Sequence, residues 1–326
     1  MLVATALLVI GLVLLAYGAD RLVFSASILC RSLGIPPIII GMTVVGIGTS
    51  LPEFIVSLSA ANHGQLDMSV GTVMGSNIIN ILLILGSAAL IHPLAVQSNL
   101  IRRELPLMLL VTLLSGFLLF NNHLSRIDGL LLISMAIVYL LVTIRIARRS
   151  LDNNSDTLTS EQLAELPRGD GGNTVAFLWL AVALIMLPVA TNMVIDNATV
   201  VADYLGVSEL IIGLTIVSVG TSLPELATVI AGALKDEDDI AIGNLIGANI
   251  YNIAIVLGVP ALLHPGSIDS EAFARDYWVM LGVSALFMLI CLQRRRRIGR
   301  LTGALLLGGF ILWVALLYFF PSESFW

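Results

Sequence analysis

One segment of this sequence occurs twice. Residues 41–86 and 213–258 align without a gap at a constant offset of 172, and 19 of the 46 aligned positions are identical. The identities include the whole run Gly-Thr-Ser-Leu-Pro-Glu and the later pattern Gly-x-Asn-Ile-x-Asn. Each copy therefore carries one carboxylate beside a proline within a strongly apolar segment. Paired, interrupted apolar helices in the two halves of a chain indicate a membrane protein whose binding site lies between repeats.

The composition is that of a polytopic membrane protein. Of the 326 residues, 58% are hydrophobic and 12% are charged, whereas soluble domains carry about 25% charged residues. The net charge of −6 does not indicate a nucleic-acid partner, because the basic residues lie at the ends of apolar stretches. We expect the lipid bilayer around the chain, no nucleic acid and no obligate protein partner. The two cysteines, Cys30 and Cys291, are expected to be reduced, buried thiols.

Ten apolar stretches can be membrane-spanning helices, each of which needs about 20 mainly apolar residues. They lie near residues 3–30, 36–61, 67–90, 105–121, 127–147, 174–202, 207–233, 239–262, 277–292 and 301–320. One long polar stretch, 148–173, separates the first five spans from the last five. We therefore expect an all-α fold with a first five-helix repeat at 1–147, a cytoplasmic linker at 148–173 and a second five-helix repeat at 174–326.

The distribution of Lys and Arg predicts the orientation of these spans. With both termini outside, 14 of the 16 basic residues fall in the inner loops, and only Arg126 and Arg275 lie outside, as the positive-inside rule requires. Because five spans is an odd number, the second repeat is then inverted relative to the first. The sequence predicts two inverted repeats whose two motifs meet near the membrane midplane.

The motif at residues 48–53 combines an interrupted helix with hard oxygen donors. Pro52 lacks an N–H group, so the carbonyl oxygen of Gly48 loses its helical partner. In hydrocarbon such a group is tolerated only where something else satisfies it. The freed carbonyls, the hydroxyls of Thr49 and Ser50 and the carboxylate of Glu53 suit Ca²⁺ or Na⁺. They do not suit zinc or copper, because no His or Cys joins the motif.

The second copy repeats each of these elements, with Thr221, Ser222, Pro224 and Glu225 at the equivalent positions. A carboxylate within a membrane is costly and indicates function. A proline that only bends a helix would not require a glutamate at the same position in both copies. We therefore interpret Glu53 and Glu225 as cation ligands.

Further polar residues follow each motif in the next predicted span. They are Ser76, Asn77 and Asn80 in the first half and Ala248, Asn249 and Asn252 in the second. An asparagine in a membrane can ligate a cation, hold a neighbouring carboxylate or join two helices, and the residues alone leave these alternatives open. The Gly-x-x-x-Gly spacing in each span favours close helix packing.

At these residues the chain resembles the calcium:cation antiporter superfamily, which includes the sodium/calcium exchangers, and within it the bacterial inner-membrane calcium/sodium antiporters of the YrbG type. Residues 41–86 and 213–258 look like the two α-repeats of that family, and the ten-span layout matches the whole chain. The resemblance implies a secondary active antiporter, not an enzyme. It would exchange Na⁺ for Ca²⁺ across the inner (cytoplasmic) membrane by alternating access, with both termini periplasmic and no cofactor besides the transported ions.

The resemblance also implies a set of ion ligands. Glu53 and Glu225 would bind Ca²⁺ and Na⁺ alternately, and carbonyl oxygens of Gly46 and Ser218 would join them. The remaining side-chain or carbonyl oxygens would come from Thr49, Thr221, Ser50, Ser222, Ser76, Asn80 and Asn252.

The chain departs from relatives of other ion specificity at a few positions. Exchangers that also carry K⁺ have an Asp where Asn252 stands, so we expect no K⁺ requirement. Proton-coupled members carry a Gly-Asn-Ala-x-Glu motif where this chain reads Asn77-Ile-Ile-Asn80, which argues against H⁺ as the main coupling ion. Ala248 replaces the serine expected from Ser76, which leaves the Na⁺ stoichiometry open. The remaining alternatives are an H⁺/Ca²⁺ exchanger of the same fold and a cation channel.

Overall fold

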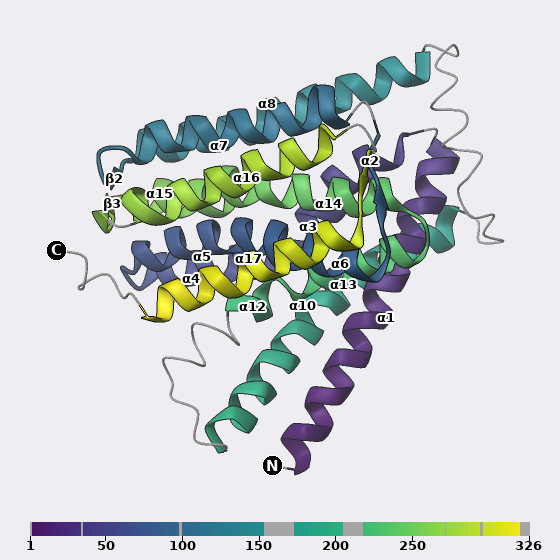
Figure 1. Ribbon diagram of the computed structural model, residues 1–326, viewed down its shortest axis with the longest axis horizontal. Coiled ribbons are helices and arrows are strands. Elements are labelled where there is room, and N and C mark those ends of the chain that lie inside the picture. The colour runs from purple at the N-terminus through teal and green to yellow at the C-terminus, as the bar shows by residue number, and fades with distance from the viewer. Residues whose placement is uncertain are drawn as a thin grey trace. The chain divides into compact units, whose positions relative to one another are not determined.

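The computed structural model describes residues 2–33, 35–97, 100–152, 173–204, 218–270, 272–293 and 296–319. Within these ranges the regular elements are helices, apart from four strands of two residues each (Figure 1). The expected helical fold is therefore confirmed for the part of the chain that is described. Most of the predicted linker lies outside it.

The chain forms two compact units. Unit 1 comprises Met1–Ile55 and Ile137–Tyr251, and unit 2 comprises Val56–Ala136 and Asn252–Trp326. Each unit therefore takes segments from both halves of the sequence. The division of the sequence into two five-helix repeats, separated by residues 148–173, stays a prediction.

Unit 1 is built from helices of both halves. They are α1 (Leu2–Leu33), α2 (Pro37–Ile40), the π-helix η1 (Gly41–Val45), α3 (Gly46–Thr49), the start of α4 (Leu51–Asn62), the end of α8 (Arg126–Asp152), α10 (Asn173–Tyr204), α12 (Ser218–Thr221), α13 (Leu223–Leu234) and α14 (Asp238–Tyr251). The long helices α1 and α10 lie side by side (Figure 1). Their contact buries small and aliphatic side chains, among them Ala19 and Ala183.

Unit 2 contains the remaining helices and all four described strands. Its elements are the rest of α4, α5 (Leu66–Ile79), η2 (Asn80–Leu85), α6 (Gly86–Ile91), β1 (Leu94–Ala95), η3 (Leu100–Glu104), α7 (Leu105–Leu119), β2 (His123–Leu124), the start of α8, η5 (Asn252–Leu257), α15 (Gly258–Leu263), β3 (Gly266–Ser267), η6 (Ala272–Tyr277), α16 (Trp278–Cys291), β4 (Arg297–Ile298) and α17 (Arg300–Phe319). Strand β1 pairs antiparallel with β4, and β2 pairs with β3. Each pair thus joins one strand from each half of the sequence.

The sequence repeat is also a repeat of secondary structure. Helices α3, α4, α5, η2 and α6 begin and end 172 residues before α12, α13, α14, η5 and α15, respectively. A π-helix begins at the same aligned asparagine in both halves. Such local widenings of a helix are rare and occur often at functional sites.

Among the described residues, seven helices are long and apolar enough to cross a membrane. An eighth span is obtained if the segments Pro37–Thr49 and Leu51–Asn62, which are bent by 43° relative to each other, are counted as one. Of the other predicted spans, 105–121 corresponds to the 15-residue helix α7, and 207–233 lies partly outside the described residues. The ten-span layout therefore stays a prediction.

Glycines bring the segment α2–η1–α3 unusually close to α14 within unit 1. A Cβ atom on Gly41 would lie 2.6 Å from the carbonyl oxygen of Ile240, and one on Gly243 would lie 2.6 Å from that of Ile38. A Cβ atom on Gly247 would overlap the carbonyl group of Met42. The close packing expected from the Gly-x-x-x-Gly spacing is therefore confirmed for Gly243 and Gly247. It is wrong for Gly71 and Gly75 in the first half, where an added Cβ atom would meet no described heavy atom within 4 Å.

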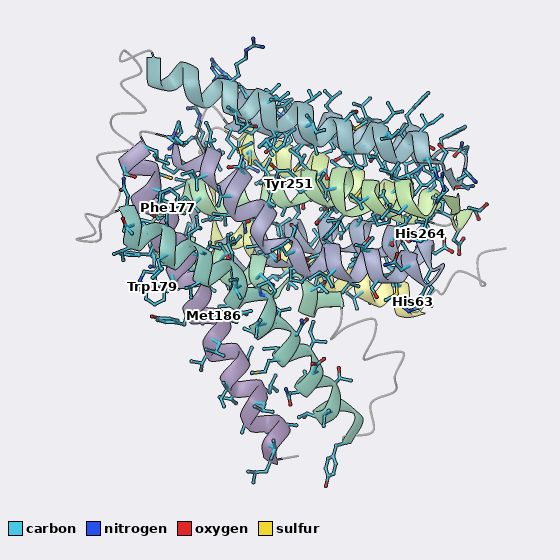
Figure 2. All side chains as sticks on the ribbon, turned by 180° about the vertical axis from the view of Figure 1, so that it is seen from behind. His63, Phe177, Trp179, Met186, Tyr251 and His264 are labelled. Carbon is cyan, nitrogen blue, oxygen red and sulfur yellow. The ribbon has the colours of Figure 1, made fainter. Side chains whose placement is uncertain are left out.

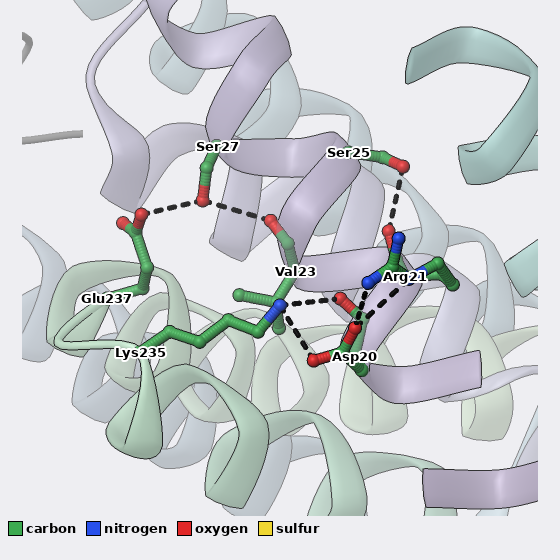
Figure 3. Close-up of polar contacts among 7 residues, drawn as sticks. All are labelled: Asp20, Arg21, Val23, Ser25, Ser27, Lys235 and Glu237. Atoms are coloured by element: carbon green, nitrogen blue, oxygen red, sulfur yellow. Dashed lines mark hydrogen bonds and ion pairs between the residues drawn. The ribbon is translucent and has the colours of Figure 1, made fainter. Parts of the chain in front are cut away.

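A polar cluster links α1 to the turn between α13 and α14 (Figure 3). The Nζ atom of Lys235 lies 2.7 Å from Oδ1 of Asp20, whose Oδ2 atom also accepts a 2.6 Å bond from Arg21. Seven residues further along α1, Ser27 Oγ donates to Glu237 Oε1 over 2.7 Å. Asp20 therefore forms a local ion pair with Arg21 and a second one with Lys235 of the turn between α13 and α14.

We expect Gly247→Ala to destabilise the protein, because the added methyl group would meet backbone atoms that cannot move aside without shifting η1. Overpacking of this kind costs roughly 1–3 kcal/mol. Gly75→Ala is the matched control at the aligned position, since a Cβ there meets no described heavy atom within 4 Å. Thermal unfolding of the detergent-purified variants should show a lower midpoint for Gly247→Ala alone. Equal midpoints would contradict the close packing.

The turn also predicts a pH dependence. Burial raises the pKa of the Glu237 carboxyl group, and Asp238 and Asp236 raise it further, while Ser27 and Lys235 act in the opposite direction. A pKa that is higher in the folded than in the unfolded state means that the folded protein binds this proton more tightly. Its stabilising contribution is therefore full below the ordinary pKa of a glutamate and is lost as the pH rises through the raised pKa.

Thermal unfolding measured across this pH range should show a steeper loss of stability for the wild type than for Glu237→Gln. The glutamine keeps an oxygen for Ser27 but has no charge to desolvate. Asp236→Asn, at an exposed neighbouring position, should retain most of the wild-type pH dependence. A Glu237→Gln variant with the full wild-type slope would show that another group is responsible.

Candidate cation site

Both copies of the motif interrupt their helix at the same serine. Helix α3 ends at Thr49, Ser50 has φ −80° and ψ 8°, and α4 begins at Leu51. In the second copy, Ser222 has φ −90° and ψ 9° between α12 and α13. The following proline then occupies the first turn of the new helix, where its missing N–H costs nothing. The predicted interruption at the Leu-Pro-Glu sequence is confirmed in both halves.

The two motifs meet within unit 1. Ser222 Oγ donates a 2.9 Å hydrogen bond to Glu53 Oε1, and Ser50 Oγ donates a 3.1 Å bond to Glu225 Oε1. Each serine therefore holds the carboxylate of the opposite motif. All four side chains are buried, with exposed fractions of 3% or less.

Each carboxylate keeps one unused oxygen. The Oε2 atoms of Glu53 and Glu225 are buried and have no hydrogen-bond partner among the described residues, and neither glutamate forms an ion pair there. A carboxylate oxygen is an acceptor, and a buried charge without a partner is expensive. The arrangement therefore favours occupation by a cation or a proton.

The other predicted ligands of unit 1 belong to the same two motifs or shortly precede them in the sequence. Thr49 and Thr221 are buried, and Thr49 Oγ1 donates a 3.0 Å bond to Asn244 Oδ1. The carbonyl oxygen of Gly46 accepts only long bonds, 3.3 Å from the backbone N–H of Ser50 and 3.4 Å from Thr49 Oγ1. Ser218 is the first described residue of α12, and its side chain lies outside the description.

Unit 2 gathers the asparagines that follow the motifs. Ser76, Asn77, Asn80 and Asn252 are all buried. Asn252 Nδ2 donates a 3.1 Å hydrogen bond to Asn77 Oδ1, whereas Asn252 Oδ1 is buried without a partner among the described residues. The donor end of this amide is therefore used, and its acceptor end is available. Direct ion ligation by Ser76, Asn80 and Asn252 stays a prediction.

The structure places Asn244 against Thr49, although the sequence repeat does not mark this residue. Its aligned counterpart in the first half is Thr72. The only signal in the sequence is a second asparagine in the apolar stretch that also carries Asn249.

The histidines and cysteines do not contribute to this group. His63 and His264 lie in exposed positions at the same end of unit 2 (Figure 2), where Nε2 of His264 lies 2.7 Å from Oδ1 of Asn62. Cys30 and Cys291 are buried free thiols, as expected. Among the described residues, no three His, Cys, Asp or Glu side chains form a metal-binding group. A transition-metal site therefore has no support in this part of the chain.

Comparison with known proteins gives a consistent result. The sodium/calcium exchanger protein family matches residues 3–145 and 175–319. The chain is 62% identical over 318 residues to the inner membrane protein YrbG of Escherichia coli K12, covering 98% of each chain. It is 44% identical over 320 residues to the putative antiporter CaxA of Alkalimonas amylolytica, covering 98% of this chain and 99% of that one.

The fold agrees with a solved structure of the same family. The sodium-calcium exchanger NCX_Mj, soaked with Na⁺ and Ca²⁺, matches with a TM-score of 0.82 and 30% identity over 97% of this chain and 98% of that chain. The resemblance inferred from the two motifs, including that to the YrbG type, is confirmed. The chain belongs to the sodium/calcium exchanger protein family.

Proposed function

We propose that this protein is a secondary active antiporter that exchanges Na⁺ for Ca²⁺ across the bacterial inner membrane, with Glu53 and Glu225 binding the two ions alternately. The observation that carries the proposal is the pair of buried carboxylates, each held by a serine of the other motif and each with one unused oxygen. Hard oxygen donors of this kind are what Ca²⁺ prefers. No cofactor is needed besides the transported ions.

The charge of the site supports exchange rather than leak. Two ionised carboxylates carry a charge of −2, which one Ca²⁺ or two Na⁺ neutralise. An empty site would leave both charges unpaired in surroundings of low dielectric, at a cost on the order of several kcal/mol. The carrier therefore changes its access only when it is filled. A third Na⁺ would leave a charge of +1, and moving it through 100 mV is worth about 2.3 kcal/mol.

The wider ligand set of the proposal follows the repeat. Hydroxyl groups of Thr49, Thr221, Ser50 and Ser222 and the carbonyl oxygens of Gly46 and Ser218 would complete the coordination, with Ser76, Asn80 and Asn252 as further ligands. Because both asparagine positions are uncharged, we propose transport that does not depend on K⁺. H⁺/Ca²⁺ exchange by the same fold is the alternative, since a buried carboxylate can also take a proton.

The proposal includes the ten-span topology with two inverted repeats and both termini outside. It is supported by the common offset of 172 between the helix bounds of the two halves and by the positions of Lys and Arg. The strand pairs of unit 2, each of which joins the two halves, fit the same internal symmetry.

The first test is uptake of ⁴⁵Ca²⁺ into proteoliposomes at clamped voltage. We expect uptake into vesicles loaded with Na⁺ and none into vesicles loaded with K⁺. An acid interior without Na⁺ should not drive uptake. Uptake driven by the proton gradient would instead identify an H⁺/Ca²⁺ exchanger. Uptake that needs no counter-ion would identify a channel, since a channel requires only an open path.

The second test concerns the carboxylates. Glu53→Gln and Glu225→Gln should each abolish exchange, because each removes one of the two charges that attract the ions while keeping the shape of the side chain. Glu237→Gln is the matched control, since Glu237 is a buried glutamate of the same unit outside the motifs. All three variants should elute as folded protein in size-exclusion chromatography. Normal uptake by either motif variant would overturn the site assignment.

A further inference from the structure

The hydroxyl group of Thr49 differs in its partner from those of Ser50 and Ser222. Ser50 and Ser222 donate hydrogen bonds to carboxylates, whereas Thr49 Oγ1 donates a 3.0 Å hydrogen bond to the amide oxygen of Asn244. Thr49 and Asn244 are both completely buried. The contact joins α3 to α14 within unit 1, across the glycine-mediated packing described above.

The close packing explains how the amide reaches the motif. A Cβ atom on Gly41 would lie 3.2 Å from the backbone nitrogen of Asn244, and one on Gly46 would lie 3.2 Å from the backbone nitrogen of Ala248. The backbones of η1, α3 and α14 therefore nearly touch. A side chain as short as asparagine spans the remaining distance to Thr49.

A hydroxyl group donates one hydrogen bond, and two acceptors compete for that of Thr49. The amide oxygen of Asn244 lies 3.0 Å from Thr49 Oγ1, and the carbonyl oxygen of Gly46 lies 3.4 Å away. A bond to Gly46 would occupy a lone pair of another predicted cation ligand. Because the shorter bond goes to Asn244, the carbonyl oxygen of Gly46 and the lone pairs of Thr49 Oγ1 remain available to a cation.

We propose that Asn244 is a positioning residue for ion binding: by accepting the hydrogen bond of Thr49, it makes the threonine oxygen available as a cation ligand and keeps the carbonyl oxygen of Gly46 free. The inference rests on the exchange function proposed above. Asn244 acts through Thr49 and does not itself touch the ion.

The amino group of the Asn244 side chain gives no other reason for an asparagine at this position. Asn244 Nδ2 is buried and has no hydrogen-bond partner among the described residues. A buried donor without a partner costs free energy, so packing alone would favour an apolar residue of similar size here. Among the described residues, the bond to Thr49 is the one hydrogen bond of this side chain.

The repeat offers a natural comparison. The aligned residue of the first half, Thr72, is partly exposed, and its hydroxyl donates to the carbonyl oxygen of Met68 in its own helix over 2.7 Å. The repeated fold therefore does not require an amide at this position. Thr72→Val is a matched control that removes a polar group from the equivalent site.

The test is Na⁺-dependent ⁴⁵Ca²⁺ uptake by Asn244→Leu, whose side chain has the same number of heavy atoms and the same branching but no acceptor. We expect the KM for Ca²⁺ to rise about 3–10-fold, as for the loss of one hydrogen bond, with a maximal rate within about twofold of the wild type. Asn244→Asp restores an acceptor oxygen and should return the KM to the wild-type value or below, while Thr72→Val should not change it. An unchanged KM in Asn244→Leu, or a rise shared by Asn244→Asp, would overturn the proposal.

A double variant separates positioning from a general structural role. Thr49→Val and Thr49→Val/Asn244→Leu should have the same KM, because Asn244 has nothing to position once the hydroxyl is gone. If the KM changes of Thr49→Val and Asn244→Leu instead add in the double variant, Asn244 acts through a residue other than Thr49. If Asn244→Leu does not fold, Asn244→Val, whose smaller side chain also has no acceptor, takes its place with the same expectation.

Failure of the proposed function and failure of this inference give different results. Absence of Na⁺-dependent uptake by the wild type would reject the exchange function alone. Equilibrium binding of ⁴⁵Ca²⁺ to the purified wild type and to Asn244→Leu then still tests the inference, since the wild type should bind about 3–10-fold more tightly.

Discussion

The structure depends on two carboxylates buried among apolar helices without a basic partner. Their charge cannot be relieved by a salt bridge in the described part of the chain, and hydroxyl groups of the opposite motif satisfy only one oxygen of each. Such an arrangement is tolerable only if a cation or a proton neutralises the carboxylates for most of the time. The stability of the fold is therefore coupled to the occupation of this site.

Backbone geometry makes this arrangement possible. The serine that interrupts each helix lies immediately before the Leu-Pro-Glu sequence, so the carboxylate stands in the first turn of a new helix. The N-terminal end of a helix favours negative charge. Glycines at 41, 243 and 247 then allow α14 to approach the interrupted segment almost backbone to backbone. A helix with ordinary side chains at these positions would hold its polar groups too far away to hydrogen-bond with the motif.

Much of the fold and of the candidate site could be predicted from the sequence. The other features depend on tertiary contacts. Proline and glutamate within an apolar run stand out locally, so the helix interruption and the pairing of Glu53 with Glu225 could be predicted. The role of Asn244 depends on which helix packs against Thr49, and no local pattern encodes that. The π-helices that begin at Asn80 and Asn252 have no clear propensity signal either. The composition of the two compact units also depends on how distant segments pack.

The two halves of the site are similar but not identical, and the differences between them matter for transport. The serine–glutamate bonds obey the repeat, but Asn244 faces Thr49 where the other half has Thr72, and Ala248 stands where the other half has Ser76. In a carrier whose halves were identical, the states open to either side would have equal energy. A ligand shifts such an equilibrium only through its different affinity for the two states. If this chain works as proposed, departures from the repeat around a common pair of carboxylates are therefore where it would bind an ion more tightly from one side than from the other.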